Sequence, residues 1–552
     1  MKPKKSTDME SYRSIYSIVD HVQEKGLVLY GAGVLGEIAL QIFALFQVKP
    51  ACFCDDDPQK QGSNFECDGI SVPVISLDEA AQRFPSAIYI ITATSGAKNG
   101  PRDRMKTCLK ERNLLSKDSA FYPLRYLFLL DGGLEALKHS KIPDSSSFTP
   151  ERLENIVLFS STGRSGTMFF DMLMDGHPNI LNIGGFGAFV SLNKAYLDQL
   201  QYLEDDELVI EVARHMQAYF TSHAVKQNLL GHYLTSDGEC EERVYISPTK
   251  FISALAGLLM GKGCVSFTCL FKAIFAAYHN IIGKQYIPGQ PYWIFFETHL
   301  TDCNTTEYDG LLSPEDFNRF EHWVIIREPV QQVFSSIQLM YQRWVLERRY
   351  RWFHPDALYK CFSGSLGIGL ERRAENQNKI IKVIRFEDAK RRTRETMQAV
   401  CNWMDIKFDE CMLETTVNGI KVYFPSAATD KKRTISAHDT TAIDRHDFSK
   451  FLSTYDVFRL NFAFQNVQRA YGYDCDLPDY RNFSEAFWEE LFQEPFRYEE
   501  WVNEVYVETQ KHGYLAPGVP PYYSGVVKMI LDYLAQDSHE LITDMICPEG
   551  DG

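Results

Sequence analysis

The chain has 552 residues, of which 45% are hydrophobic and 24% are charged, a composition that supports several packed domains and excludes a disordered chain. Its net charge of −16 argues against a protein that coats nucleic acid, because neutralising phosphates requires clustered Lys and Arg. The two most apolar stretches, 251–260 and 267–282, fall short of the roughly 20 apolar residues of a membrane span, so we expect buried helices there.

The 13 cysteines are scattered without the paired spacing of a zinc site, which is typical of reduced thiols. We therefore predict no metal site. The polar N-terminal segment contains no apolar signal core, and this predicts a cytoplasmic protein. Three regions follow one another along the chain, at residues 1–150, 151–475 and 476–552.

The first region alternates strands and helices, which predicts an α/β fold with a doubly wound, Rossmann-like parallel sheet. Its first strand, 27–30, precedes three glycines spaced as GxGxxG, namely Gly31, Gly33 and Gly36. The next strand ends at Asp55, so the context is that of a dinucleotide fingerprint. Segment 55–62 also resembles nucleotide-binding or sugar-nucleotide-binding domains attached to bacterial transferases. We expect NAD(P) or a nucleotide-sugar as the ligand; the alternative is a scaffold without a ligand.

The second region opens with a strand at 155–159, a loop at 160–167 and a helix at 168–175. This placement aims backbone N–H groups and a helix N-terminus at one point, which favours an anion. Arg164 adds a positive charge, and Ser165 and Thr167 add hydroxyl donors. A nucleotide triphosphatase loop would carry Lys where Thr167 stands, so we predict a phosphate-binding loop of another class. The alternative is a helix cap whose Ser and Thr side chains serve only the helix.

A second candidate phosphate site follows the buried strand predicted at 323–326. This strand ends at Arg327, and a helix is expected over 330–343. Arg327 and Ser335 are eight residues apart, so both side chains can reach one phosphate. The alternative is a solvent-facing Arg and an ordinary helical Ser.

Together, these two loops resemble the PAPS-dependent sulfotransferases, where PAPS is 3′-phosphoadenosine 5′-phosphosulfate. Segment 162–167 is similar to the family's 5′-phosphosulfate loop, and Arg327 with Ser335 is similar to its 3′-phosphate motif. Segment 382–388 resembles the family's "RYEDL" strand, with Phe386 in place of Tyr. The basic segment 431–433 stands where the family often covers the 3′-phosphate.

The resemblance implies a P-loop-like parallel-sheet domain over 151–475 with helical insertions, followed by a helical C-terminal extension over 476–552. It implies transfer of a sulfuryl group from PAPS to the hydroxyl or amine of a small-molecule or carbohydrate acceptor, with 3′-phosphoadenosine 5′-phosphate (PAP) as product and without a metal ion. The residues expected to bind PAPS are Thr162, Gly163, Arg164, Ser165, Gly166, Thr167, Arg327, Ser335, Phe386, Lys432 and Arg433.

The acceptor proton needs a base, and two candidates follow the strand predicted at 293–296. If that strand continues, Glu297 and His299 point to one face at the carboxyl edge of the sheet. The segment resembles the family's "KTHLP", whose His is the base, and a His with a pKa near 6.5 suits this work. Glu297 is the second candidate, because other branches use a Glu, and a structural His299 is the third possibility.

Two other functions are consistent with parts of the sequence. The glycine-rich first region alone would suit an NAD(P)-dependent oxidoreductase, with the later region as its substrate domain. A non-catalytic nucleotide-binding regulator would keep the phosphate loops but need no base. The register of Arg164 with Arg327 and Ser335 favours the sulfotransferase over the oxidoreductase. A His299 or Glu297 that faces Arg164 argues against the regulator.

Overall fold

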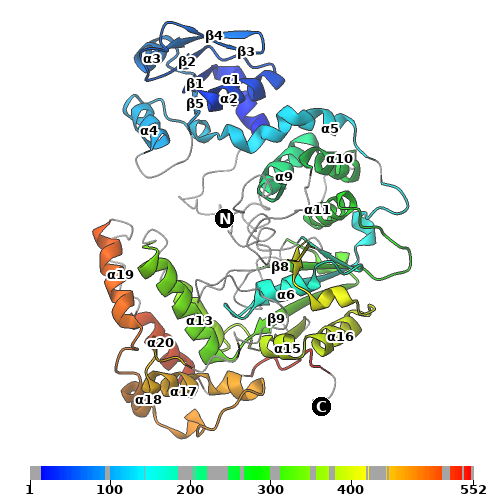
Figure 1. The fold of residues 1–552 in the computed structure, drawn as a ribbon, viewed down its shortest axis with the longest axis vertical. Helices are drawn as coiled ribbons and strands as arrows, with labels where there is room; N and C mark the ends of the chain where they lie inside the picture. Colours follow the sequence, from blue (N-terminus) through cyan, green and yellow to red (C-terminus); the bar gives the residue numbers. More distant parts are fainter. Residues whose placement is uncertain are drawn as a thin grey trace. The chain divides into compact units, whose positions relative to one another are not determined.

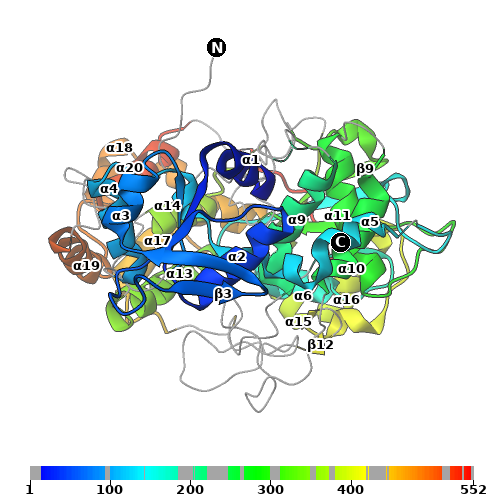
Figure 2. The ribbon, with the colours of Figure 1, turned by 90° about the horizontal axis from the view of Figure 1, so that it is seen from above.

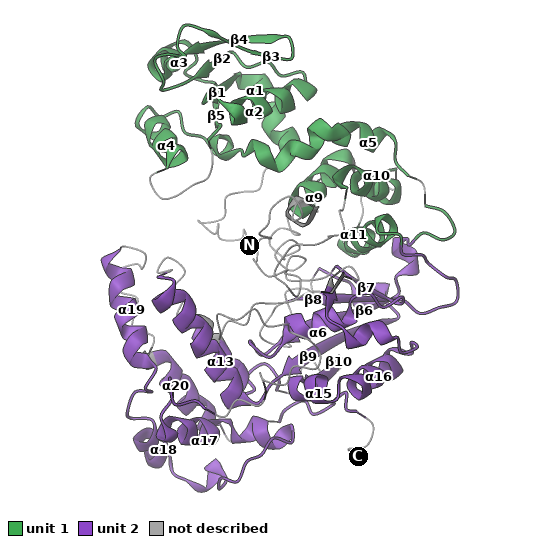
Figure 3. Cartoon of the chain, viewed as in Figure 1, with its two compact units in different colours: residues 1–147, 195–221, 245–283 green, residues 148–194, 222–244, 284–552 purple. Residues whose placement is uncertain are grey.

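The computed structural model describes residues 14–93, 100–141, 143–183, 200, 203, 205–220, 247–261, 266–298, 311–348, 356–371, 379–417, 420–421, 443, 447–512, 523–536 and 540–548 (Figure 1). The chain forms two compact units (Figure 3). Unit 1 consists of residues 1–147, 195–221 and 245–283, and unit 2 of residues 148–194, 222–244 and 284–552. The helices at 205–220 and 248–281 therefore belong with the N-terminal segment and not with the rest of the second sequence region.

Unit 1 contains a five-stranded sheet with the order β3-β4-β2-β1-β5. The strands are β1 (Leu27–Tyr30), β2 (Cys52–Cys54), β3 (Asn64–Cys67), β4 (Ile70–Ile75) and β5 (Ile88–Ile91). All neighbouring pairs are parallel except β3 with β4. Counted along the parallel strands alone, the order is 3-2-1-4, and the expectation of an α/β fold with parallel strands is confirmed.

The helices of unit 1 are α1 (Ile15–Lys25), α2 (Val34–Leu45), α3 (Leu77–Arg83), α4 (Pro101–Glu111), α5 (Leu134–Lys138), α9 (Asp205–Phe220), α10 (Pro248–Leu259) and α11 (Phe267–Ile281). The later helices join the earlier ones directly, since the Ile15 N–H donates to the Glu211 carboxylate at 3.0 Å and the Tyr16 hydroxyl to Asp206 at 3.1 Å. The expected buried helices are thus α10 and α11. Within the described residues, no helix has the length and apolarity needed to cross a membrane.

Unit 2 contains a five-stranded, fully parallel sheet with the order β10-β9-β6-β8-β7. Its strands are β6 (Asn155–Ser161), β7 (Ile180–Asn182), β8 (Trp293–Glu297), β9 (Arg319–Ile326) and β10 (Ile380–Arg385). Strand β6 is central, with Phe159 opposite Glu297 on one side and Trp323 on the other. Because all strands are parallel, the segments that follow them emerge at one edge of the sheet.

The helices of unit 2 are α6 (Thr167–Met174), α13 (Pro329–Tyr341), α14 (Asp356–Ser365), α15 (Phe386–Arg391), α16 (Thr393–Met404), α17 (Thr454–Ala470), α18 (Glu485–Leu491), α19 (Glu499–Lys511) and α20 (Tyr523–Leu534). A short antiparallel pair, β11 (Thr416–Val417) and β12 (Ile420–Lys421), is also present. Helices α15 and α16 lie side by side in two perpendicular views (Figure 1, Figure 2). Segment 382–388 is not a continuous strand, because β10 ends at Arg385 and Phe386 opens α15.

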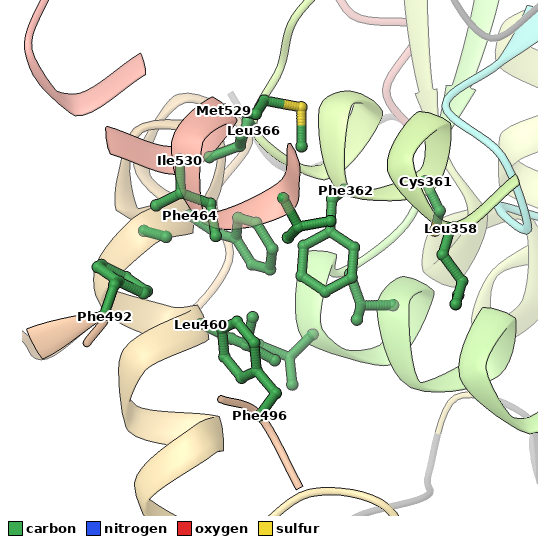
Figure 4. Close-up of a cluster of buried hydrophobic side chains, with 14 of the residues drawn as sticks. Leu358, Cys361, Phe362, Leu366, Leu460, Phe464, Phe492, Phe496, Met529 and Ile530 are labelled. Atoms are coloured by element: carbon green, nitrogen blue, oxygen red, sulfur yellow. The ribbon is translucent and has the colours of Figure 1, made fainter. Parts of the chain in front are cut away.

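Many helices of both units begin at a serine whose hydroxyl accepts an N–H of the first turn, an arrangement that stabilises the helix start. These residues are Ser14, Ser76, Ser247, Ser266, Ser453 and Ser484. The C-terminal helices share one apolar core with α13, α14 and α17 (Figure 4). In this core, Phe362 of α14 and Phe464 of α17 lie near Phe496 and Ile530. Each cysteine in the described part of the chain is a free thiol.

Candidate anion-binding site

The loop between β6 and α6 is a tight turn whose backbone conformation is rare outside glycine. Strand β6 continues to Ser161, two residues beyond the expected end, and α6 begins at Thr167. Between them, Gly163, Arg164 and Gly166 have φ angles of 82°, 53° and 93°. A non-glycine residue such as Arg164 in this region is uncommon, and strained residues of this kind cluster at ligand sites. Turns of this type also present backbone N–H groups to anions.

Ser165 supplies a buried hydroxyl to the loop. Its side chain is fully buried, and within the described residues its Oγ has no hydrogen-bond partner. Burying a hydroxyl without a hydrogen-bond partner costs free energy, so this group suits a ligand that accepts a hydrogen bond from it. Ser161, by contrast, is already used inside the loop, because its Oγ accepts the Gly163 N–H at 3.3 Å.

Arg164 adds a positive charge to the loop. Its side chain keeps solvent access, and within the part of the chain that the structure describes it forms no ion pair. The surrounding protein desolvates the guanidinium, and Arg327 and Arg343 repel it, which together lower its pKa to about 10. It therefore stays charged at neutral pH. The repulsion of Arg164 by two neighbouring guanidinium groups makes a bound anion beside it favourable.

Arg327 and Phe386 join the loop from two other segments of the chain. Arg327 is 7% exposed, and its Nη1 donates to the carbonyl oxygen of Arg164 at 3.4 Å. Its guanidinium lies 5.2 Å from the centroid of the Phe386 ring. That ring also covers Gly166, where an added Cβ would lie only 2.2 Å from the ring carbon Cδ2. The loop between β6 and α6 thus meets the end of β9 and the start of α15 at one point.

The carboxylates beside this cluster have structural partners. Glu328 begins α13 by accepting the N–H groups of Val330 at 3.2 Å and Gln331 at 2.7 Å. Burial raises the pKa of this carboxyl. The Glu328 N–H donates to Glu387 at 3.0 Å, and the Tyr473 hydroxyl donates to the other oxygen of Glu387 at 3.0 Å. These bonds fix the end of β9 against the start of α15.

The two adjacent serines of α13 differ in their contacts. Ser336 is buried and donates to the Sγ atom of Cys361 at 2.9 Å. Ser335 is half-buried, and its side chain forms no hydrogen bond within the described residues. The expected ligand-binding serine, Ser335, is therefore the one whose hydroxyl stays available.

The candidate bases are only partly described. Glu297 is the last residue of β8, 4% exposed, and the following Thr298 donates its hydroxyl to the Phe159 carbonyl at 3.0 Å. His299 lies outside the described residues, as do Lys432 and Arg433. The structure does not test the roles expected of Glu297, His299, Lys432 and Arg433, which stay predictions.

Sequence reasoning missed three residues that contact the loop or repel its arginine. Gln332 hydrogen-bonds Thr162, Gly364 contacts the Thr162 carbonyl, and Arg343 acts on Arg164. Arg327, Ser335 and Arg343 follow one another at intervals of eight residues. This regular spacing is a signal that could have found Arg343. Gln332 and Gly364 carry no such signal.

The glycine loop of unit 1 has a distinct role for each glycine. An added Cβ on Gly36 would lie 2.4 Å from the Gly31 carbonyl oxygen, so glycine lets α2 approach β1 closely. A Cβ on Gly33 would meet nothing within 4 Å. Gly31 itself has a φ of 114°. The loop therefore has open space at its second glycine and none at its third.

Asp55 holds this glycine loop from the end of β2. Its carboxylate accepts the Ala32 N–H at 2.7 Å and the Asp57 N–H at 2.9 Å, and it pairs with Lys60 at 3.2 Å. Burial opposes its ionisation, but these partners outweigh burial and lower its pKa. Asp55 thus shapes the loop, and its direct contact with a ligand stays a prediction. Among the described residues, no group of three or more His, Cys, Asp or Glu side chains could hold a metal ion.

Comparison with known proteins gives weak similarities. No protein-family model and no curated protein match the chain. A solved sulfotransferase domain from the curacin biosynthetic pathway is 13% identical, with a TM-score of 0.31 over 59% of this chain and 100% of that domain. The sulfotransferase domain of the Synechococcus PCC 7002 olefin synthase is 14% identical, with a TM-score of 0.31 over 61% of this chain and 99% of that domain. Likenesses this weak carry no argument about function, which has to come from the site.

Proposed function

We propose that the protein transfers a sulfuryl group from PAPS to a hydroxyl or amine of a small-molecule or carbohydrate acceptor. One observation carries this proposal: Arg164, Arg327 and Phe386, from three distant segments, meet beside an unpartnered buried hydroxyl at the carboxyl edge of a parallel sheet. Two anionic groups of one nucleotide would account for both arginines. The free thiols fit a cytoplasmic setting.

The residues of the site fit such a donor. The 5′ side of PAPS would be held by the loop N–H groups, Arg164 and Ser165. Its 3′-phosphate would be held by Arg327 and Ser335. PAPS would supply a sulfuryl group already bonded to a phosphate leaving group. Arg164 would stabilise the negative charge that develops on that leaving group, without a metal ion. His299, or else Glu297, would take the proton of the acceptor.

The chemistry of the loop disfavours an ordinary nucleotide triphosphatase. That class needs a Lys followed by a Ser or Thr, which hold the terminal phosphates and magnesium. Here Thr167 follows Gly166 and opens α6. The phosphate-binding cation is instead Arg164, inside the turn itself.

For unit 1 we propose a separate nucleotide ligand, NAD(P) or a nucleotide-sugar, at the glycine loop. The open space at Gly33, the close approach at Gly36 and the 3-2-1-4 strand order support it. Since the sequence offers no partner for hydride transfer, we assign this site a binding role only.

Calorimetric titration with PAP tests the main proposal, with ATP plus magnesium and NAD as comparison ligands. Arg164→Ala and Arg327→Ala should abolish PAP binding, whereas Gly33→Asp should retain it. The last variant is a suitable control, because Gly33 has an ordinary φ of −137° and open space around it. Binding of NAD without any binding of PAP would instead support the oxidoreductase.

A further inference from the structure

Both polar atoms of the Gln332 side-chain amide, on α13, form hydrogen bonds with Thr162, the first residue of the loop. The Thr162 hydroxyl donates to Gln332 Oε1 at 3.1 Å, and Gln332 Nε2 donates to the Thr162 carbonyl oxygen. Gln332 is 1% exposed, and Thr162 is 2% exposed. Both bonds are therefore shielded from water, where such bonds are costly to break.

Helix α14 closes the other side of Thr162. An added Cβ on Gly364 would lie 2.4 Å from the Thr162 carbonyl oxygen, so the helix backbone itself contacts the loop. The same helix is tied to α13 by the Ser336 hydroxyl, which donates to Cys361. Thr162 is thus enclosed between α13 and α14.

These contacts connect the two halves of the candidate site. The loop carries Arg164 and Ser165, whereas Arg327 lies two residues before α13 and Ser335 lies on that helix. The loop and α13 are joined twice, by Gln332 with Thr162 and by Arg327 with the Arg164 carbonyl. Two attachments at separate points restrict how far α13 can shift relative to the loop. Holding binding groups at a fixed spacing before the ligand arrives increases selectivity for a ligand of matching length.

We propose that Gln332 is a positioning residue that fixes the spacing between the loop and the Arg327–Ser335 pair, so that the protein selects nucleotides with phosphate groups at both the 5′ and the 3′ position. This inference rests on the proposed function and extends it. Gln332 itself touches no ligand. It acts through Thr162 on one side and through the position of α13 on the other.

The test compares the affinity for PAP with the affinity for adenosine 5′-phosphate, both by calorimetry on the full chain. The ratio of the two dissociation constants measures what the 3′-phosphate contributes. Gln332→Met keeps the side-chain length but removes both hydrogen bonds, and we expect the ratio to fall at least tenfold. Gln332→Glu keeps an acceptor for the Thr162 hydroxyl but cannot donate to its carbonyl, and we expect an intermediate ratio.

Ser336→Ala is the matched control, because Ser336 lies one turn further along the same helix, is equally buried, and its hydroxyl donates to Cys361 of α14 and not to the loop. It should keep the wild-type ratio. Thermal unfolding of each variant identifies those that fold. If Gln332→Met does not fold, Gly364→Ala replaces it, since its Cβ would displace the Thr162 carbonyl from the other side.

A wild-type ratio in a folded Gln332→Met or Gly364→Ala variant would overturn the inference. So would an equal loss of affinity for both nucleotides, which is what a merely structural role produces. A wild-type protein that binds PAP no better than adenosine 5′-phosphate would overturn the proposed function instead. The two failures are therefore distinguishable.

Discussion

The guanidinium of Arg327 lies over the ring of Phe386, 5.2 Å from its centroid, and the same ring closes over Gly166. The ring thus contacts both the cation and the loop. A cation above an aromatic face gains about 0.5–2 kcal/mol, depending on desolvation. We expect Phe386→Leu to weaken PAP binding about tenfold, measured by calorimetry. Phe386→Tyr keeps the ring and should bind as the wild type does; equal affinities in all three proteins would contradict this role.

Gly166→Ala should disrupt the loop. Its φ of 93° alone costs a non-glycine residue about 1–2 kcal/mol, and the new Cβ would overlap the Phe386 ring. We expect a lower unfolding temperature and loss of PAP binding, measured by thermal unfolding and calorimetry. Gly33→Ala, where the new Cβ meets nothing, is the control and should change the unfolding temperature little. Normal stability and binding in Gly166→Ala would show that the loop has another conformation.

Arg164→Gln should abolish PAP binding without lowering the stability of the ligand-free protein. Desolvation and the repulsion from Arg327 and Arg343 lower the pKa of Arg164 to about 10, so folding disfavours its charge at every pH below that value. This destabilisation is relieved as pH rises through about 10, and removing the charge relieves it at neutral pH. We expect the ligand-free variant to unfold at the same or a higher temperature at low ionic strength, while PAP binding is lost. A less stable variant that still binds PAP would contradict both statements.

Glu499 should make the stability of unit 2 depend on pH. Burial raises the pKa of this 1% exposed carboxyl to about 8, with Arg459 and Asp456 of α17 as its charged neighbours. Because the folded pKa lies above the unfolded one, the stability that Glu499 contributes is fully present below about pH 4.5 and is lost as pH rises to about 8, by about 1.4 kcal/mol per pH unit. Glu499→Gln should flatten this slope in denaturant unfolding. The exposed neighbour Glu500→Gln should leave it unchanged, and a slope preserved in Glu499→Gln would refute the assignment.

The base is testable apart from binding. His299→Ala should lower the release of PAP from PAPS by about 10²–10⁴-fold across a panel of hydroxyl and amine acceptors. PAP affinity should not change. Glu297→Gln is the paired variant, and a larger rate loss there than in His299→Ala would assign the base to Glu297. Loss of PAP affinity in both variants would place these residues in the binding site instead.

Local sequence pattern predicted the buried strands β1, β6, β8 and the end of β9, because buried β-strands are short apolar runs between turn residues. It did not reveal β3, β4 or β7. Strand β6, the loop and α6 occur within two residues of the expected positions. The same pattern could not show that Phe386 opens a helix. Arg385, the last residue of β10, pairs with Asp388 in the first turn of α15 and so favours the start of the helix there.

Contacts between distant segments could not be predicted from one sequence. Gln332 and Thr162 are 170 residues apart and form no motif, although they share two hydrogen bonds. The membership of α9 in unit 1 rests likewise on the pairing of Glu211 with the Ile15 N–H, which no periodicity reveals.

The order of the chain has a consequence for how the protein is made. Helices α9 to α11 complete unit 1, yet β6, α6 and β7 of unit 2 precede them in the sequence. During translation, α1 and α5 are therefore made before their partners α9 and α10, the second of which ends at residue 259. A gene fragment that stops at residue 150 would leave those helix faces uncovered, and we expect it to aggregate. The N-terminal sheet can be studied alone only if 205–283 are grafted back onto it.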